Sequence, residues 1–270
     1  MRTIVHISDI HFGDANHMVV ERLVEAIAEL QPDLVVVSGD LTQRARSAQF
    51  RNARAFLDRL PRPQLIVPGN HDVPLYNVVS RFLTPLKKYR RHITANLTPE
   101  FCDDEIGVFG INTTRSLTIK GGRVTDHQVD DLVSRLNVVD ESKLKIVVTH
   151  HPFDLPEGFD EDDIVGGAKK VMPRLVECGA DIFLAGHLHV STITYSARRY
   201  RLDNGYSALI IQAGTAASLR ERGEENSFNL LELENPILTV KRFQCGLPES
   251  GFHLATTEQF SKTDRGWSRM

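Results

Sequence analysis

Residues 3–11 read TIVHISDIH, an apolar run that ends in an Asp-x-His pair. Four later segments repeat the arrangement of a Val-, Ile- and Leu-rich run followed by Gly, Asp, Asn or His: DLVVVSGD (33–40), LIVPGNHD (65–72), LKIVVTHH (144–151) and DIFLAGHLH (181–189). Nearly continuous apolar runs of this length are typical of strands that are buried on both faces. We therefore predict five buried strands, each followed by polar residues.

Stretches with helical periodicity lie between these strands. In residues 19–30 the apolar side chains of Val20, Leu23, Val24, Ile27 and Leu30 fall on one face of a helix. Residues 49–60 and 167–178 show the same period, although Pro173 restricts the second of these helices. Strands that alternate with helices predict an α/β protein with a mainly parallel core.

The second part of the chain departs from this alternation. Residues 190–244 contain several strand-like stretches, with turns expected at Asn204-Gly205 and Asn235-Pro236, so antiparallel strands are predicted there. Residues 246–270 show no clear period, and we expect a surface tail or a cap over the sandwich. The sequence is accordingly interpreted as one domain over residues 1–245 with a C-terminal tail or cap over residues 246–270.

A potential metal ligand follows each of the five predicted strands. In open α/β sheets, ligands bind beyond the carboxyl ends of the strands, and residues i and i+2 of an extended segment point to the same side. We expect the following side chains to converge: Asp9, His11, Asp40, Asn70, His71, His150, His151, His187 and His189.

Each motif also has an ordinary structural interpretation. Gly39-Asp40 could be a simple turn, Asn70-His71-Asp72 an Asx-turn, and His150-His151 part of a solvated loop. The structural interpretation requires five independent coincidences, because all five motifs occupy the same end of successive strands. The joint pattern therefore favours a metal site.

The ligand types and their number predict two divalent ions. No cysteine belongs to the set, and imidazole, carboxylate and amide groups suit Mn, Fe, Zn or Co. The seven candidate ligands other than His71 and His151 exceed the need of one tetrahedral ion, and Asp40 is the natural bridge. Two divalent cations, two aspartates and a bridging hydroxide would leave a formal charge of about +1, which attracts a phosphate ester and stabilises its transition state.

The whole-chain composition argues against several partners. The formal net charge of −3 lacks the basic excess of a protein that binds nucleic-acid backbone, so polymeric nucleic acid is not expected, although a local basic patch is compatible with a balanced total. The three cysteines have no close motif spacing, which indicates reduced thiols and a cytoplasmic location. No run of about 18 apolar residues occurs, so no membrane partner is expected.

The five segments, in this order, resemble the motif set of the calcineurin-like metallophosphoesterases: D-x-H, G-D, G-N-H-D, a downstream H, and G-H-x-H. The resemblance covers residues 3–189 and implies a four-layer α/β/β/α sandwich of two mixed sheets flanked by helices. It assigns one metal to Asp9, His11, Asp40 and His189. It assigns the other metal to Asp40, Asn70, His150 and His187, with His150 preferred to His151 because family members often have a single His before x-Pro.

The resemblance also implies catalytic roles. His71 would lie outside the metal shell and contact the substrate phosphate or protonate the leaving oxygen, and Asp72 would orient His71. The stretches SDIHFG, GDLTQ and GTAASLRERGEENSFN are similar to a bacterial branch of the family that contains class III cyclic-nucleotide phosphodiesterases and glycerophosphodiesterases.

Further substrate contacts are proposed besides Asn70 and His71. Arg220 and Arg222 lie between two predicted strands, where a planar guanidinium could bind phosphate. A charged surface turn is the favoured interpretation of that segment, because exposed charges outnumber functional ones. Arg44 and Arg46 receive the same interpretation, and His17 is retained because it lies close to the first motif.

The predicted function is hydrolysis of a small phosphodiester, of the 3′,5′-cyclic nucleotide or glycerophosphodiester type, by a metal-bridging hydroxide. A phosphomonoesterase or nucleotide pyrophosphatase would use the same metal centre, because the pocket walls choose the substrate. A metal-dependent nuclease and a non-catalytic binding module are further alternatives. The sequence leaves open whether copies of the chain form a homo-oligomer.

Overall fold

Two β-sheets form the centre of the molecule in the computed structural model, which describes residues 1–118, 120–203, 205–219 and 224–270. The seven-stranded sheet has the order β13-β12-β11-β10-β1-β2-β3. Its strands are β1 (Arg2–Ile7), β2 (Leu34–Val37), β3 (Gln64–Ile66), β10 (Asn226–Glu234), β11 (Ile237–Cys245), β12 (His253–Thr263) and β13 (Gly266–Arg269). Strands β1, β2 and β3 are parallel, and β10 to β13 pair antiparallel, so this sheet is mixed.

The six-stranded sheet has the order β4-β5-β6-β7-β9-β8. Four parallel strands form its centre and an antiparallel strand lies at each edge. The strands are β4 (Glu100–Cys102), β5 (Ile106–Gly110), β6 (Leu144–Val148), β7 (Ala180–Ala185), β8 (Thr192–Tyr195) and β9 (Leu209–Gln212).

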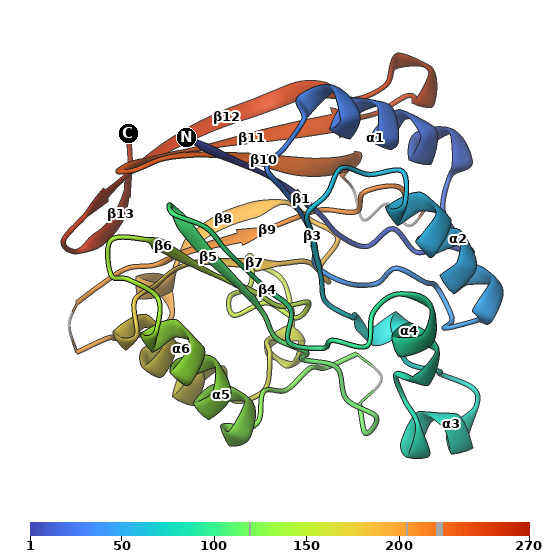
Figure 1. Ribbon diagram of the computed structural model, residues 1–270, viewed down its shortest axis with the longest axis horizontal. Coiled ribbons are helices and arrows are strands. Elements are labelled where there is room, and N and C mark those ends of the chain that lie inside the picture. Colours follow the sequence, from blue (N-terminus) through green and yellow to red (C-terminus); the bar gives the residue numbers. More distant parts are fainter. Residues whose placement is uncertain (119, 204, 220–223) are drawn as a thin grey trace.

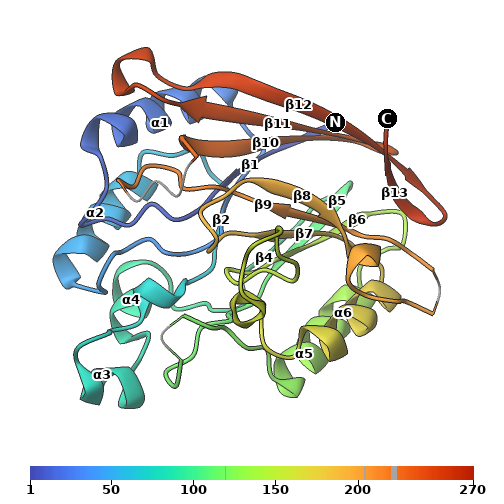
Figure 2. The same ribbon diagram turned by 180° about the vertical axis from the view of Figure 1, so that it is seen from behind.

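Helices cover the two outer faces of this pair of sheets (Figures 1 and 2). Helices α1 (His17–Leu30) and α2 (Ser47–Leu57) lie on the seven-stranded sheet, and α5 (Asp126–Asn137) and α6 (Ala168–Glu177) lie on the six-stranded sheet. Two short helices, α3 (Val78–Leu83) and α4 (Lys87–His92), follow β3, and α4 packs against α2. Single 3₁₀ turns occur at Asn70–Asp72, Glu161–Asp163, Ser196–Arg198 and Pro248–Ser250. The architecture is the expected four-layer α/β/β/α sandwich.

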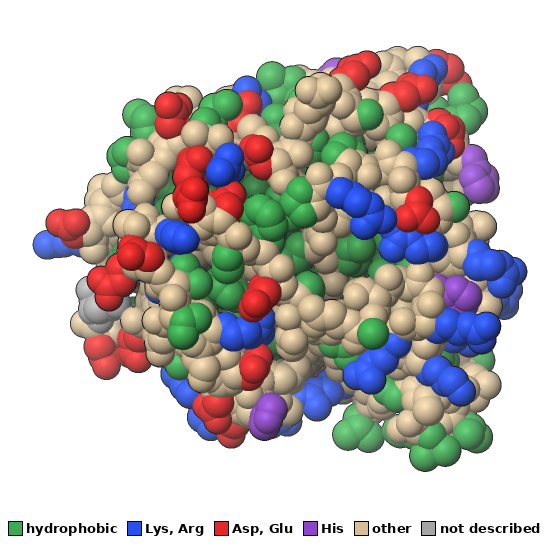
Figure 3. Space-filling view, in the orientation of Figure 1, with side chains coloured by type: hydrophobic (Ala, Val, Ile, Leu, Met, Phe, Trp, Pro, Cys, Tyr) green, Lys and Arg blue, Asp and Glu red, His purple; other side chains and the backbone are tan. Residues whose placement is uncertain are grey.

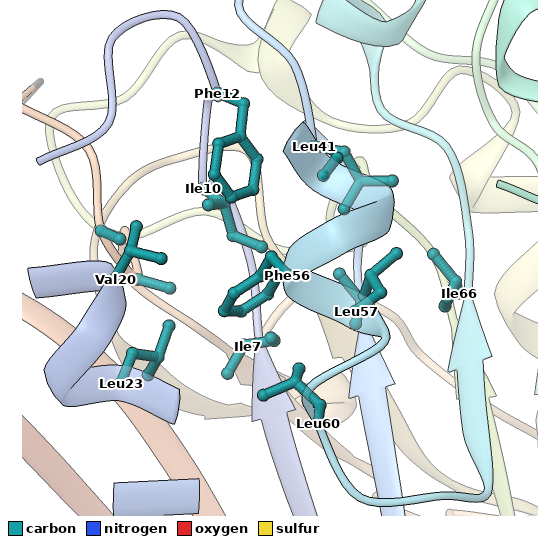
Figure 4. Packing of buried hydrophobic residues seen from close by; sticks show 14 of the residues in the cluster. Ile7, Ile10, Phe12, Val20, Leu23, Leu41, Phe56, Leu57, Leu60 and Ile66 are labelled. Carbon is teal, nitrogen blue, oxygen red and sulfur yellow. The ribbon is translucent and has the colours of Figure 1, made fainter. Parts of the chain in front are cut away.

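Alternation along each strand builds three hydrophobic layers. In β1, Val5 and Ile7 face the helices, whereas Ile4 belongs to the layer between the sheets. Figure 4 shows the first layer, where Leu23 from α1 and Phe56 from α2 converge on Ile7. Apolar burial on both faces of a sheet explains why the five decisive segments are nearly continuous hydrophobic runs.

Residues 246–270 differ from the expected tail or cap. Strand β12 pairs with β11 along most of its length, and β13 turns back on β12, so the segment extends the seven-stranded sheet. Much of β12 is exposed or half-buried, and its polar residues obscure the strand period in the sequence. Phe260 and Trp267 are buried in the layer between the sheets. Among the described residues, every helix is too short or too polar to serve as a membrane span.

Candidate metal centre

The carboxyl ends of strands from both sheets meet at one edge of the sandwich. Within the seven-stranded sheet, the Asp9 amide donates to the Gly39 carbonyl (3.1 Å). Across the two sheets, the His187 amide donates to Asp9 Oδ2 (2.9 Å), and His150 Nδ1 donates to the Ser38 carbonyl (2.7 Å). The polar residues that follow four different strands are therefore held together by hydrogen bonds in which at least one partner is a backbone group.

Asp9, His11 and His189 form one cluster in this edge. Asp9 Oδ1 lies 3.5 Å from His11 Nε2 and 3.3 Å from His189 Nε2, and the two imidazole nitrogens are 3.2 Å apart. All three side chains are buried, with exposed fractions of 0, 0 and 5%. Their ligand atoms satisfy the distances expected of a group that holds one cation.

Asp40, Asn70, His150 and His187 form the neighbouring cluster. Asn70 Oδ1 lies 3.0 Å from His150 Nε2 and 3.2 Å from His187 Nδ1. Asp40 Oδ2 lies 3.5 Å from His150 Nε2 and 3.7 Å from His11 Nε2 of the first cluster. One oxygen of Asp40 therefore faces ligands of both clusters, which is the position required of a shared carboxylate.

The surrounding hydrogen bonds present the correct nitrogen of His150. A carbonyl oxygen can only accept, so the contact with Ser38 places the ring proton on Nδ1. The lone pair is then on Nε2, which faces Asp40 and Asn70. A hydrogen bond of this kind to the distal nitrogen is the usual support of a metal-bound histidine.

The backbone at the cluster is held in an unfavourable conformation. Asp9, His11, Asp40, His187 and His189 have φ angles of 54°, 54°, 51°, 74° and 63°. Residues with a Cβ rarely adopt this left-handed region, and such strain is concentrated at functional sites. The strands end shortly before these positions, and the side chains of the left-handed residues meet at the shared edge.

The electrostatics of the cluster call for additional positive charge. Burial by itself raises the pKa values of Asp9 and Asp40, but the neighbouring histidines together outweigh it and lower both, with His189 contributing most at Asp9 and His150 most at Asp40. For His150, burial disfavours the charged ring and Asp40 favours it, and the balance raises the pKa to about 9. Two buried carboxylates thus require either protons on the imidazoles or bound cations.

Unsatisfied polar atoms in the first cluster are suited to contact a cation. Among the described residues, Asp9 Oδ1 and His11 Nδ1 are buried without a hydrogen-bond partner. Buried carboxylate oxygens are normally hydrogen-bonded, and coordination to a metal ion would satisfy Asp9 Oδ1. The donor set, its burial and this orphaned oxygen fit divalent metal ions.

His71 lies at the rim of the two clusters. Its amide donates to Asp40 Oδ1 (2.8 Å), and its ring Nδ1 donates to the Gln43 carbonyl (2.9 Å). The ring is half-buried and packs edge-on against His11, with 4.8 Å between centroids. His71 also forms a possible metal-holding group with His11 and Asp40, so distance alone does not separate a metal ligand from a substrate contact.

Asp72 has partners other than the expected ring of His71. Its carboxylate accepts from the amides of Leu41 (3.2 Å), Thr42 (2.9 Å) and Gly69 (3.0 Å), and from Thr42 Oγ1 (3.0 Å). Asp72 therefore fixes the turn that follows Asp40, while Gln43 orients the His71 ring. The reason is geometric, because residues 70–72 form a 3₁₀ turn that directs Asp72 inward beneath the loop.

Comparison with known proteins identifies the family. Residues 2–191 match the model of the calcineurin-like phosphoesterase family. The chain belongs to this family. Two curated relatives are similar over shorter stretches. Glycerophosphodiester phosphodiesterase GpdQ of Enterobacter lignolyticus (strain SCF1) is 30% identical over 171 residues, which cover 59% of this chain and 60% of that protein.

The second relative is named a probable cyclic nucleotide phosphodiesterase, from Vesicomyosocius okutanii subsp. Calyptogena okutanii (strain HA). It is 23% identical over 158 residues, which cover 56% of this chain and 61% of the relative. Both matches thus span about three fifths of the relatives' length.

Solved structures share the fold at low identity. A dimetal phosphatase from Danio rerio superposes with a TM-score of 0.65 at 15% identity, covering 89% of this chain and 95% of that one. Purple acid phosphatase PPD1 from yellow lupin (Lupinus luteus) gives a TM-score of 0.68 at 13% identity, covering 96% of this chain and 53% of that one. These similarities show that the chain shares its fold with the two phosphatases.

His151 is placed differently from the neighbouring His150. Its Nδ1 lies 2.7 Å from Thr113 Oγ1, and its Nε2 lies 2.7 Å from the Lys120 carbonyl. The ring is buried near His187, although its nitrogens are engaged by protein groups. This arrangement favours His150 as the ligand, and His151 instead holds Thr113 and Lys120 against the centre.

The remaining candidates lie away from the clusters or outside the described residues. His17 is exposed at the start of α1, where it lies near Glu21, and no contact between described residues joins it to the metal-ligand side chains. Arg220 and Arg222 lie outside the described residues. Arg44, by contrast, is half-buried with a guanidinium nitrogen 3.4 Å from His71 Nδ1.

Supporting residues near the site were not identified from the sequence. Ser8 Oγ donates to Asp9 Oδ2 (2.6 Å), and the Gln43 carbonyl orients His71. Asp163 Oδ1 lies 3.7 Å from His187 Nε2. A serine precedes both Asp9 and Gly39-Asp40, and this repeat could have been detected in the sequence. Asp163, by contrast, belongs to an acidic run (160–163) with the composition of a solvated loop.

Proposed function

We propose that this calcineurin-like phosphoesterase is a binuclear-metal phosphodiesterase acting on a small phosphodiester of the glycerophosphodiester or 3′,5′-cyclic nucleotide type. The position of Asp40 carries the proposal, since one of its oxygens faces His150 of one cluster and His11 of the other. The two curated relatives are named as enzymes of these two substrate types, which supports a diester rather than a monoester.

Seven side chains would hold two divalent ions, with Asp40 shared between them: Asp9, His11, Asp40, Asn70, His150, His187 and His189. Such ions bind phosphate oxygens and lower the pKa of coordinated water, and Mn, Fe and Zn all accept these ligands. Asn70 and the histidines are neutral ligands, so only the two carboxylates of Asp9 and Asp40 oppose the four positive charges of two divalent ions. The chain's own ligand set therefore makes the site attractive to an anionic ester.

His71 would act on the leaving group. Its Nδ1 proton is committed to the Gln43 carbonyl, so proton exchange with a substrate would take place at Nε2. Arg44 next to this ring adds positive charge at the rim. The proposed task of His71 is donation of a proton to the departing alkoxide oxygen, a step that needs a fixed ring but no metal coordination by it.

Turnover of two chromogenic esters tests the diester assignment. The purified full chain, treated with chelator and reloaded with Mn, is expected to hydrolyse bis-p-nitrophenyl phosphate faster than p-nitrophenyl phosphate. Chelator alone should abolish the activity. A clear preference for the monoester would refute the diester proposal and leave a phosphomonoesterase with the same centre.

A His71→Ala variant tests the proposed proton transfer. We expect two metal ions per chain to remain, measured by inductively coupled plasma mass spectrometry, with a fall in kcat on the order of 10²–10⁴-fold. Loss of one metal ion from this variant would show that His71 is a ligand and would contradict the assigned role.

A further inference from the structure

An exposed apolar tip extends from the seven-stranded side of the molecule beyond β3. Helix α3 and its flanks expose large hydrophobic side chains: Tyr76 (74%), Val79 (68%), Phe82 (51%) and Leu83 (76%). Leu117, which is 85% exposed, follows Ser116, whose carbonyl accepts from Arg81 of α3. Contiguous exposed apolar side chains of this kind mark an interaction surface.

The tip is held in place by a buried arginine. Arg81, 7% exposed, donates to the carbonyls of Pro74 (3.1 Å), Ser116 (2.7 Å) and Thr118. These three acceptors come from the segment before α3 and from the loop 112–118. The hydrophobic side chains are therefore presented outward by a braced scaffold.

Exposed cations gather in the part of the chain that contains this tip. Residues 41–92 contain eleven Lys or Arg against two Asp or Glu, whereas the rest of the chain has 21 basic residues against 33 acidic ones. Five of these cations are exposed, and no carboxylate of the described residues lies within salt-bridge distance of them: Arg46, Arg51, Lys87, Arg90 and Arg91. The basic surface is thus concentrated in a chain whose total charge is negative.

Tertiary contacts bring these cations to one face. Helix α4 packs on α2, and the His92 ring stacks on Phe50 with 6.1 Å between centroids. Burial is the main cause that lowers the pKa of His92, and the nearby positive charges of Arg91, Arg51 and Lys88 lower it further. Figure 3 shows basic side chains over the region of α2 and α4, with hydrophobic side chains at the α3 tip beside them. The Arg44 guanidinium lies over the Tyr76 ring at 5.9 Å and joins the two parts.

We propose that this face docks peripherally on an anionic phospholipid bilayer. The apolar tip would enter the interface between headgroups and acyl chains, and the unpaired cations would contact the lipid phosphates, the combination that binds proteins to anionic membranes. The expectation of no membrane partner was based on spanning segments and does not bear on this kind of binding. Because Arg44 also contacts His71, docking would bring the metal centre close to the membrane surface.

Two other occupants fit less well. A second copy of the chain in a two-fold dimer would bring the same unpaired cations together, which is unfavourable. Nucleic acid would pair with the cations, but it would leave Val79, Phe82 and Leu83 exposed to water. A bilayer satisfies both the charge and the apolar side chains.

Vesicle co-sedimentation of the full chain tests the proposal. Binding is expected to vesicles of phosphatidylcholine with 30% phosphatidylglycerol, to be absent with phosphatidylcholine alone, and to weaken in 0.5 M NaCl. Arg90→Gln with Arg91→Gln should reduce the vesicle partition coefficient on the order of tenfold or more. Phe82→Ser with Leu83→Ser should reduce it by at least a similar factor, while the thermal unfolding midpoint stays unchanged.

Matched surface variants provide the controls. Lys169→Gln removes an exposed cation on α6, and Val138→Ser removes an 84% exposed apolar side chain after α5. Both residues lie on another part of the molecule, and neither substitution should alter the vesicle partition coefficient. The proposal is overturned if the wild-type chain fails to bind the anionic vesicles. It is also overturned if the Phe82 and Leu83 variant loses only self-association in sedimentation velocity, or if the Arg90 and Arg91 variant loses only binding to single-stranded DNA.

Discussion

Asn70 contributes a neutral oxygen to the cluster that it forms with Asp40, His150 and His187. Its Oδ1 is within 3.2 Å of nitrogens from His150 and His187, which follow different strands. A carboxylate would coordinate at the same place but would remove one unit of the positive charge on which substrate attraction depends. Substitutions of Asn70 can therefore separate the effect of losing a metal ligand from the effect of changing the charge of the site.

Two substitutions of Asn70 should have different effects. We expect Asn70→Ala to lower the occupancy of one metal, because the amide oxygen is lost, and to reduce kcat/KM at least tenfold. Asn70→Asp should retain both metals but raise KM for an anionic diester. Metal content by mass spectrometry and steady-state kinetics measure the two effects, and equal metal loss in both variants would contradict the charge argument.

At the scale of elements, the end of β7 is packed tightly against the end of β1. A Cβ added at Gly186 would lie 1.8 Å from Ser8 Oγ and 2.6 Å from Asp9 Oδ2. The Ser8 hydroxyl and the Asp9 carboxylate occupy this space, so the absence of a Cβ at Gly186 allows the two sheets to approach. The glycine therefore contributes to the site through the distance between two strands.

Gly186→Ala is expected to disturb the Asp9 cluster and to destabilise the fold by about 1–3 kcal/mol, the usual cost of overpacking. Urea unfolding and metal titration would measure these changes. Gly121→Ala is the matched control, because the nearest atom to its added Cβ is 3.6 Å away. Similar stability losses in both variants would argue against the close approach of β7 and β1.

Strand β12 has a structural role that its polar sequence conceals. Phe260 is 1% exposed, and its ring packs T-shaped near Tyr195 of the other sheet, with 6.4 Å between centroids. We expect Phe260→Ala to lower the free energy of unfolding by about 3–5 kcal/mol. Leu254→Ala on the same strand is a control with 50% exposure and should change it little. If Phe260→Ala were equally mild, residues 246–270 would behave as a dispensable tail after all.

At the scale of the whole molecule, a histidine is buried between the two sheets. His6 is fully buried, its Nε2 lies 2.9 Å from Ser38 Oγ, and burial lowers its pKa to about 3, with Asp9 opposing the shift. An unfolded chain would titrate this residue near pH 6.5. Between about pH 3 and pH 6.5, His6 is protonated in the unfolded state but neutral in the folded state.

Stability should consequently fall as the pH drops from about 6.5 towards 3, by up to about 1.4 kcal/mol per pH unit from this residue. The contribution is fully present above pH 6.5. Urea unfolding of the metal-free wild type and His6→Gln at pH 7 and pH 5 measures it as a difference between the two slopes. Parallel stability profiles would show that His6 titrates normally in the folded protein.

The local sequence was sufficient for the five buried strands β1, β2, β3, β6 and β7, for helices α1, α2 and α6, and for the choice of candidate ligands. Continuous apolar runs predict doubly buried strands because burial on both faces leaves no room for polar residues, and parallel strands place their carboxyl ends at a common edge. The resemblance to the family implied the sandwich of two sheets, and it also implied the proposed division of the ligands between two metals.

Tertiary structure alone decided which groups support those ligands. The Asp72 carboxylate binds the backbone of residues 41, 42 and 69 instead of the His71 ring, and Asp163 approaches His187 from a loop with the composition of a surface segment. Only packing revealed that β12 belongs to the sheet and that the cations of α2 and α4 share one face with the α3 tip. Burial periodicity and chemical type are local properties of the chain, whereas these contacts depend on distances between segments far apart in sequence.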